Sequence, residues 1–154
     1  MKNILIDTCV FIHIIRESIT GKRCLDALIN FDEDPNIIIS VVTKAELESF
    51  IIQNTWGQAK IDKLNNILQD ITYIDISNAD NLLIDSYTKI DAFSKKKIKD
   101  NKGNLLNGSA RKMGKNDLWI AATAYALDIT LMTTDGDFDH LNSILLDIVK
   151  ITSI

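Results

Sequence analysis

Residues 129–135 read Ile-Thr-Leu-Met-Thr-Thr-Asp, a run of β-branched and apolar side chains that ends on an acid. Such runs favour extended backbone, so we predict a strand at about 129–133 with Asp135 just beyond its end. Residues 117–127, directly before this run, are rich in alanine and carry a wide apolar face, which is typical of a helix packed on a sheet. A helix that leads into a buried strand is half of an α/β repeat.

The same alternation of strands and helices runs through the rest of the chain. Four further apolar runs predict strands at about 3–6, 36–42, 72–76 and 146–151. Helical spacing of apolar residues predicts helices at 21–31, 44–54, 58–70, 79–93 and 117–127. Strands that alternate with helices pair in parallel and are covered by helices on both faces. We therefore expect a three-layer α/β/α sandwich with a mostly parallel central sheet of about five strands.

Length and composition set the class of protein. The chain has 154 residues, of which 46% are hydrophobic and 25% are charged, as in ordinary globular proteins. We expect residues 1–154 to form a single domain with a real core. Asp7 interrupts the apolar start, and no apolar run reaches the roughly 18 residues that span a membrane. We therefore expect a soluble cytoplasmic protein that does not bind a membrane.

The two cysteines, Cys9 and Cys24, provide neither a disulfide framework nor the spacing of a metal site. Both have apolar neighbours in the sequence, so we interpret them as small buried hydrophobic residues.

Four acidic residues fall where an α/β protein presents its ligands. They are Asp7, Glu46, Asp117 and Asp135. Each either follows a predicted strand or stands near the start of a predicted helix, and ligands bind at the carboxyl ends of the strands in open parallel sheets. Carboxylates that converge there would repel one another unless a cation held them. Mg²⁺ and Mn²⁺ prefer oxygen ligands, so either ion would suit such a site.

Each acid also has a purely structural interpretation. Asp7 could cap a helix that begins at about Cys9. Glu46, in the predicted first turn of its helix, could close a capping box with Thr43. These roles would not require the acids to gather at one edge of the sheet.

The other two acids have similar alternatives. Asp117 could interact with the helix dipole, with Asn116 free to cap the helix. Asp135 belongs to an Asp-Gly turn, in which Asp137 is a possible substitute ligand. We expect no catalytic role for the two isolated histidines, His13 and His140.

The charge distribution is uneven. A net charge of -4 and a pI of about 5.1 argue against a general nucleic-acid binder. Residues 95–115, however, hold eight of the 17 basic residues and one acid, Asp100. With three glycines among the lysines, this stretch predicts a mobile or irregular loop before Asp117. It is either a solvated loop or a surface that attracts a phosphate backbone.

Four blocks of the chain resemble the PIN-domain ribonucleases, and in particular the VapC-type toxins of type II toxin–antitoxin systems. The blocks are residues 4–8, 40–47, 116–124 and 131–138. The resemblance extends over nearly the whole chain, and the order Asp, Glu, Asp, Asp matches the acidic quartet of the family. It implies cleavage of RNA by a Mg²⁺- or Mn²⁺-dependent endonuclease, a homodimer, and a cognate antitoxin that occupies the acidic groove.

The same resemblance assigns roles to individual residues. Asp7, Glu46, Asp117 and Asp135 would be catalytic, and the three aspartates would bind the metal. Thr8, Asn116 and Thr134 would support these acids. The residues that would contact RNA are Lys95, Lys96, Lys97, Arg111, Lys112 and Lys115. The chain departs from the family at Cys9, where Asn or Ser is common, and in the length of its lysine-rich stretch.

Three alternatives remain open at this point. A PIN nuclease could serve RNA processing instead of toxicity, or a PIN-like domain could bind RNA or protein without cutting. A phosphotransferase of the haloacid-dehalogenase type also has an aspartate after its first strand, but it requires a second one two positions later, where this chain has Cys9.

Overall fold

A computed structural model describes residues 1–77 and 81–154, and its centre is one five-stranded sheet in the order β3-β2-β1-β4-β5. The strands are β1 (Asn3–Ile6), β2 (Asn36–Ser40), β3 (Thr72–Ile74), β4 (Thr130–Thr133) and β5 (Ile148–Lys150). All four neighbouring pairs are parallel. The expected parallel sheet is therefore confirmed, and each of the five predicted runs contains a strand.

Six α-helices and one 3₁₀ helix surround the sheet in the described ranges. They are α1 (Thr8–Ile15), α2 (Ile19–Phe31), α3 (Val41–Gln53), α4 (Gln58–Leu68), α5 (Asn81–Ser94), α6 (Lys115–Leu127) and η1 (Gly136–Leu141). Five of the α-helices correspond to predicted ones, although the first two residues of the predicted helix 79–93 lie outside the described residues. α1 was not among the predicted helices, because its sequence Thr-Cys-Val-Phe-Ile-His-Ile-Ile is too uniformly apolar to show helical spacing.

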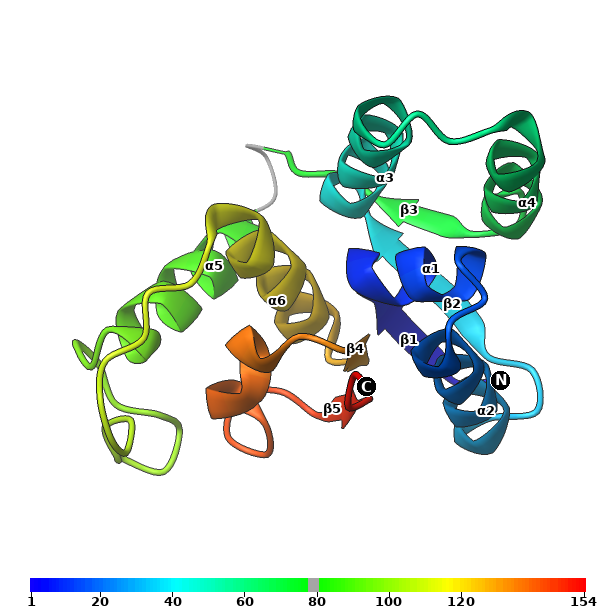
Figure 1. The fold of residues 1–154 in the computed structure, drawn as a ribbon. Helices are drawn as coiled ribbons and strands as arrows, with labels where there is room; N and C mark the ends of the chain where they lie inside the picture. Colours follow the sequence, from blue (N-terminus) through cyan, green and yellow to red (C-terminus); the bar gives the residue numbers. More distant parts are fainter. Residues whose placement is uncertain (78–80) are drawn as a thin grey trace.

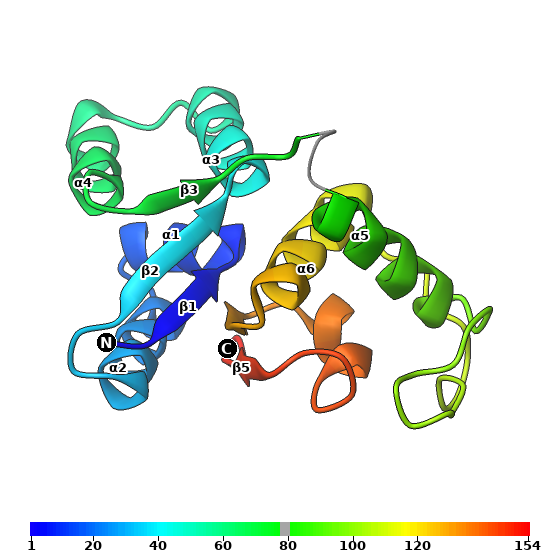
Figure 2. The same ribbon diagram turned by 180° about the vertical axis from the view of Figure 1, so that it is seen from behind.

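The helices form a layer on each face of the sheet (Figures 1 and 2). Ile4 and Ile6 of β1 pack in one core cluster with residues of α1, α2, α3 and α4. Leu5, between them, packs in the other cluster with residues of α5, α6 and η1. Successive strand residues point to opposite faces, so a strand buried on both faces is apolar throughout. The three-layer α/β/α arrangement is confirmed.

The strand order places β1 and β4 side by side, although about 120 residues separate them in the chain. The residue pair Ile6 and Met132 aligns at the ends of these two strands. The Asp7 amide then donates a hydrogen bond to the Met132 carbonyl at 3.0 Å. From β1 the chain continues to β2 on one side of β1, whereas β4 lies on the other side. The carboxyl edge between β1 and β4 is therefore a topological switch point, where open α/β sheets bind ligands.

The basic stretch forms the connection between α5 and α6, and it is irregular, as expected. Its backbone is nevertheless anchored, because the Arg111 amide donates to the Ser94 carbonyl at 2.7 Å. Leu106 and Met113 are buried in the core. The loop therefore holds its lysines on the outside of a packed segment.

None of the helices in residues 1–77 and 81–154 is both long enough and apolar enough to cross a membrane.

Candidate active site

Asp7 lies directly after β1 and is held by three hydrogen bonds. Its Oδ1 accepts from the Thr8 amide at 2.7 Å, so Asp7 is the N-cap of α1. Its Oδ2 accepts from the Thr133 hydroxyl at 2.7 Å and from the Cys9 thiol at 3.0 Å. Burial raises the pKa of Asp7, while these three donors oppose that rise. The capping role is therefore real, and it fixes the carboxylate at the carboxyl edge of the sheet.

Cys9 does not behave as the small hydrophobic residue that the sequence suggested. Its thiol donates to Asp7, lies 3.6 Å from the Thr133 hydroxyl and accepts from the Thr134 amide at 3.4 Å. Burial and the nearby Asp7 carboxylate raise the pKa of this thiol to about 12. The group therefore stays protonated and remains a hydrogen-bond donor. Cys24, by contrast, is fully buried in the apolar core, as expected.

Thr133 is the site residue that sequence reasoning missed. Its hydroxyl donates to Asp7 and accepts from the Asp135 amide at 2.9 Å, so it connects the ends of β1 and β4. The residue is fully buried. In the sequence it is one more β-branched residue of a strand, and nothing there indicated that its hydroxyl faces Asp7.

The capping box that was the structural alternative for Glu46 does not form. Ser40 is the N-cap of α3, and its hydroxyl accepts from the Val42 amide at 3.1 Å. The helix therefore begins at Val41, and Glu46 lies in its second turn, with Thr43 buried. The error has a physical cause, because the β-branched residues Val41 and Val42 extended the apparent strand by two positions.

Glu46 is instead held by two of the three polar residues that the resemblance marked. Its Oε1 accepts from the Thr8 hydroxyl at 2.8 Å, and its Oε2 accepts from the Asn116 side-chain amide at 3.2 Å. The Thr8 hydroxyl is also 3.3 Å from the Thr43 hydroxyl. Glu46 thus joins the start of α1 to the start of α6.

α6 begins at Lys115, two residues earlier than the sequence suggested. Gly114 is its N-cap, so neither Asn116 nor Asp117 caps the helix, and Asp117 lies in the first turn. Asn116 is free to reach Glu46 for this reason. Asp117 faces η1, where Asp135 caps the 3₁₀ helix by accepting from the Asp137 amide at 2.9 Å.

Three carboxylates come close enough to share one cation. Oxygen atoms of Asp117, Asp135 and Asp137 lie within 4.8 Å of one another. Asp137, which the sequence offered as a substitute for Asp135, therefore stands beside it. Asp7 and Glu46 are outside this group of three, although both are close enough to act on Asp117 electrostatically.

The electrostatics of Asp117 show how the acids are arranged around it. Burial first, and then the charges of the other four acids, together raise the pKa of Asp117 to about 7. Within the described part of the chain, none of these five acids forms an ion pair with a lysine or arginine. The donor set consists of carboxylate oxygens, so it fits a hard divalent cation such as Mg²⁺ or Mn²⁺.

The basic residues lie on the loop that precedes α6. Lys95 forms an ion pair with Asp91 at 2.9 Å, and Lys96 donates to the Gly108 carbonyl at 2.7 Å. Lys97, Arg111, Lys112 and Lys115 are exposed. Because Lys115 starts the helix that carries Asp117, the positive loop leads directly to the acidic site.

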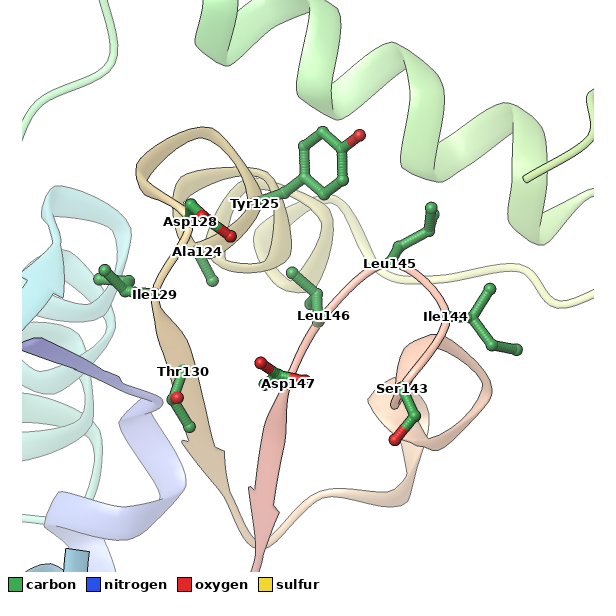
Figure 3. Close-up of a pocket in the computed structure, with 10 residues that line it drawn as sticks. All are labelled: Ala124, Tyr125, Asp128, Ile129, Thr130, Ser143, Ile144, Leu145, Leu146 and Asp147. Atoms are coloured by element: carbon green, nitrogen blue, oxygen red, sulfur yellow. The ribbon is translucent and has the colours of Figure 1, made fainter. Parts of the chain in front are cut away.

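A cavity of about 190 Å³ lies elsewhere, at the amino ends of β4 and β5. Figure 3 shows Thr130 and Asp147 at these strand starts, with Tyr125 and Asp128 from the end of α6 above them. This cavity is at the edge of the sheet opposite the five acids, and none of them lines it. The acidic edge is therefore the candidate active site.

The molecule is therefore an α/β protein with a group of carboxylates, suited to a divalent cation, at the switch point of its parallel sheet. The sequence pattern of the PIN domain matches residues 4–143. The chain therefore belongs to the PIN-domain family, whose members are nucleases. The comparison with curated proteins found no match.

Solved structures share the fold over nearly the full length. VapBC-1 of nontypeable Haemophilus influenzae matches with a TM-score of 0.69 and 20% identity, over 98% of this chain and 99% of that chain. VapBC2 of Rickettsia felis, bound to a promoter DNA fragment, matches with a TM-score of 0.67 and 22% identity, over 95% and 98% of the two chains. VapBC-5 of Mycobacterium tuberculosis, a toxin–antitoxin system, matches with a TM-score of 0.60 and 21% identity, over 98% and 100%.

Proposed function

We propose that this protein is a divalent-metal-dependent endoribonuclease and the toxin of a toxin–antitoxin pair. The observation that carries the proposal is the group of Asp117, Asp135 and Asp137, with Asp7 and Glu46 beside it and no basic partner among the described residues. Such a concentration of negative charge is costly unless a cation neutralises it.

The acids would have different roles, because their side chains are held in different ways. Asp117, Asp135 and Asp137 would hold Mg²⁺ or Mn²⁺. Asp7 would contribute through Oδ1, which accepts one hydrogen bond and so keeps a lone pair free. When bound, the ion supplies a water of lowered pKa and stabilises charge on the attacked phosphate. Glu46, fixed by Thr8 and Asn116, would orient that water by accepting a hydrogen bond from it.

The reaction we propose is hydrolysis. The water oxygen forms a bond to phosphorus and releases a proton, while the bond to the 3′-oxygen breaks and that oxygen takes up a proton, which leaves a 5′-phosphate and a 3′-hydroxyl. A histidine pair acting through the 2′-hydroxyl is not supported. His13 and His140 lie on different elements, and each is engaged by a serine hydroxyl, at 3.1 and 2.7 Å.

We propose RNA as the substrate because of the basic loop and the resemblance to VapC-type toxins. The lysines would attract the phosphate backbone, while the cation offsets its repulsion from the acids. One neighbour in fold is named as a member of the VapBC family of toxin–antitoxin systems and another as a toxin–antitoxin complex, which supports a cognate antitoxin as partner. The homodimer rests on the resemblance alone. The alternative of a PIN nuclease in RNA processing would be favoured if expression of the protein did not arrest growth.

A cleavage assay tests the proposal. Purified protein is incubated with a mixed RNA pool in Mg²⁺, in Mn²⁺ or in EDTA, beside Asp117→Asn and Asp147→Asn. Asp147 is an exposed acid at the opposite edge of the sheet, so its variant is a matched control. We expect metal-dependent cutting that Asp117→Asn abolishes and Asp147→Asn retains, with 5′-phosphates on the new ends. Cutting that persists in Asp117→Asn would rule out the proposed site.

A further inference from the structure

A second hollow lies beside the acids, between α1 and α3. Its volume is about 530 Å³, within the roughly 300–1,000 Å³ that small-molecule sites occupy. α3 lines it with Glu46, Ser49, Phe50 and Gln53, and α1 lines it with Ile12. With Val42 and Ala45, which also line it, these α3 residues follow the i, i+3, i+4, i+7 pattern, so they form one face of the helix.

This hollow is continuous with the candidate active site. Thr8, Glu46 and Asn116 line it, and the same three residues form the hydrogen-bonded link at the acids. A chain whose phosphate lies at the acids therefore has its neighbouring nucleotide within reach of the hollow. This continuity argues for a part of the substrate as the occupant.

The aromatic wall of the hollow suits a base. Phe50 is partly exposed, and the ring of Trp56 supports it edge-on, with centroids 5.3 Å apart and planes at 77°. The Arg16 guanidinium lies over the Phe50 ring, 5.1 Å from its centroid, so an arginine plane and an aromatic ring stand together at this wall. Aromatic rings and arginine planes are the surfaces on which proteins stack unpaired bases.

The polar wall suits the edge of a base. The Gln53 side-chain amide donates to the Ser49 hydroxyl at 2.7 Å, which leaves the Gln53 carbonyl oxygen as an acceptor and the Ser49 hydroxyl as a donor. Asn116 and Glu46 add further amide and carboxylate groups. Such mixed donors and acceptors can discriminate between bases by their hydrogen-bonding edges.

We propose that this hollow is a nucleobase pocket, which holds the base next to the cut phosphate and so sets the RNA sequence that is cleaved. The proposal rests on the proposed ribonuclease function. Phe50 stacks the base, and Gln53 and Ser49 read its edge.

The test compares Phe50→Leu with wild type on randomised RNA oligonucleotides. Leucine fills most of the volume and removes the ring. Phe31→Leu is the matched control, because Phe31 is also partly exposed, has Lys2 at 5.7 Å from its centroid, and does not line the hollow. We expect Phe50→Leu to weaken the preference at one position beside the cut and to lower kcat/KM on the preferred oligonucleotide about ten-fold. Phe50→Tyr keeps the ring and should restore both.

An oligonucleotide with an abasic nucleotide at the preferred position completes the test. On this substrate wild type and Phe50→Leu should cut equally well, since the base that stacks on the ring is gone. If both variants and wild type cut with the same preference and rate, the pocket proposal fails while the ribonuclease stands. A variant that weakens only the binding of the antitoxin assigns the hollow to the protein partner and also overturns the proposal. If wild type cuts no RNA, the proposed function fails and the pocket proposal fails with it.

Discussion

Removal of the charge at Asp117 should stabilise the protein in the absence of metal. Folding raises the pKa of Asp117 from 3.8 to about 7, mainly through burial and then through the neighbouring acids. The folded state therefore holds the proton more tightly than the unfolded chain does. This contribution to stability is present in full below about pH 4 and is lost as the pH rises to about 7. Above that pH, the charged Asp117 destabilises the metal-free fold.

The size of the effect follows from the same pKa. A change from 3.8 to about 7 corresponds to roughly 4 kcal/mol, at 1.36 kcal/mol for each pKa unit. Asp117 is only half-buried, so water and salt screen its charge, and we expect about 1–2 kcal/mol. Asp117→Asn in EDTA should therefore be more stable than wild type by that amount at pH 8 and equally stable near pH 4.

Urea unfolding followed by circular dichroism measures the difference, with Asp147→Asn as the control that should match wild type at both pH values. Mg²⁺ should reverse the order, because a ligand at 100 times its Kd adds roughly 2.7 kcal/mol to the state that binds it. Wild type should gain this stability, and Asp117→Asn should gain little. If Asp117→Asn is less stable than wild type in EDTA at pH 8, the repulsion we describe is not present.

Three further predictions concern the hydrogen bonds and the loop. Thr133→Val should have a free energy of unfolding in urea that is lower than that of wild type by about 1.5–3 kcal/mol, because a buried carboxylate loses a donor. Thr133→Ser keeps the hydroxyl and should retain most of the stability of wild type. Equal stability of both variants would contradict the link to Asp7. Cys9 should resist iodoacetamide at pH 8 and react only on unfolding, since its pKa is about 12, whereas rapid labelling of the native protein would show an open thiolate. Lys97→Ala and Lys112→Ala should each lower the slope of log binding constant against log salt by about one, measured by RNA titration, and an unchanged slope would remove these lysines from the RNA surface.

The sequence predicted the sheet well because burial on both faces leaves a plain signal. Strands such as 4–6 and 130–133 are continuous apolar or β-branched runs, and each predicted strand was found. The ends of the strands were harder to predict where β-branched residues continue into a helix. Val41 and Val42 begin α3, but their residue type extended the expected strand beyond Ser40. α1 was expected only in the alternative in which Asp7 caps a helix, because a helix that is apolar on nearly all sides shows no amphipathic period.

The sequence also selected the acids but not their partners. Asp7, Glu46, Asp117 and Asp135 could be found because each follows a strand or starts near a helix, and position along the chain suffices to place such residues at one edge of a parallel sheet. Whether they meet depends on which strands are neighbours. The strand order, with β4 beside β1, is what brings Asp135 and Asp137 near Asp117 and Asp7.

The sequence by itself determined the α/β class and the family, and it selected the acids of the candidate site, because local patterns of burial and a short ordered set of motifs carry that information. Only the tertiary structure decided that Thr133 and the Cys9 thiol hold Asp7, and that Thr8 and Asn116 hold Glu46. Most of these bonds join residues that are 38 to 126 positions apart. A hydrogen bond requires its two atoms to lie within about 3 Å, and that condition is set by packing in three dimensions.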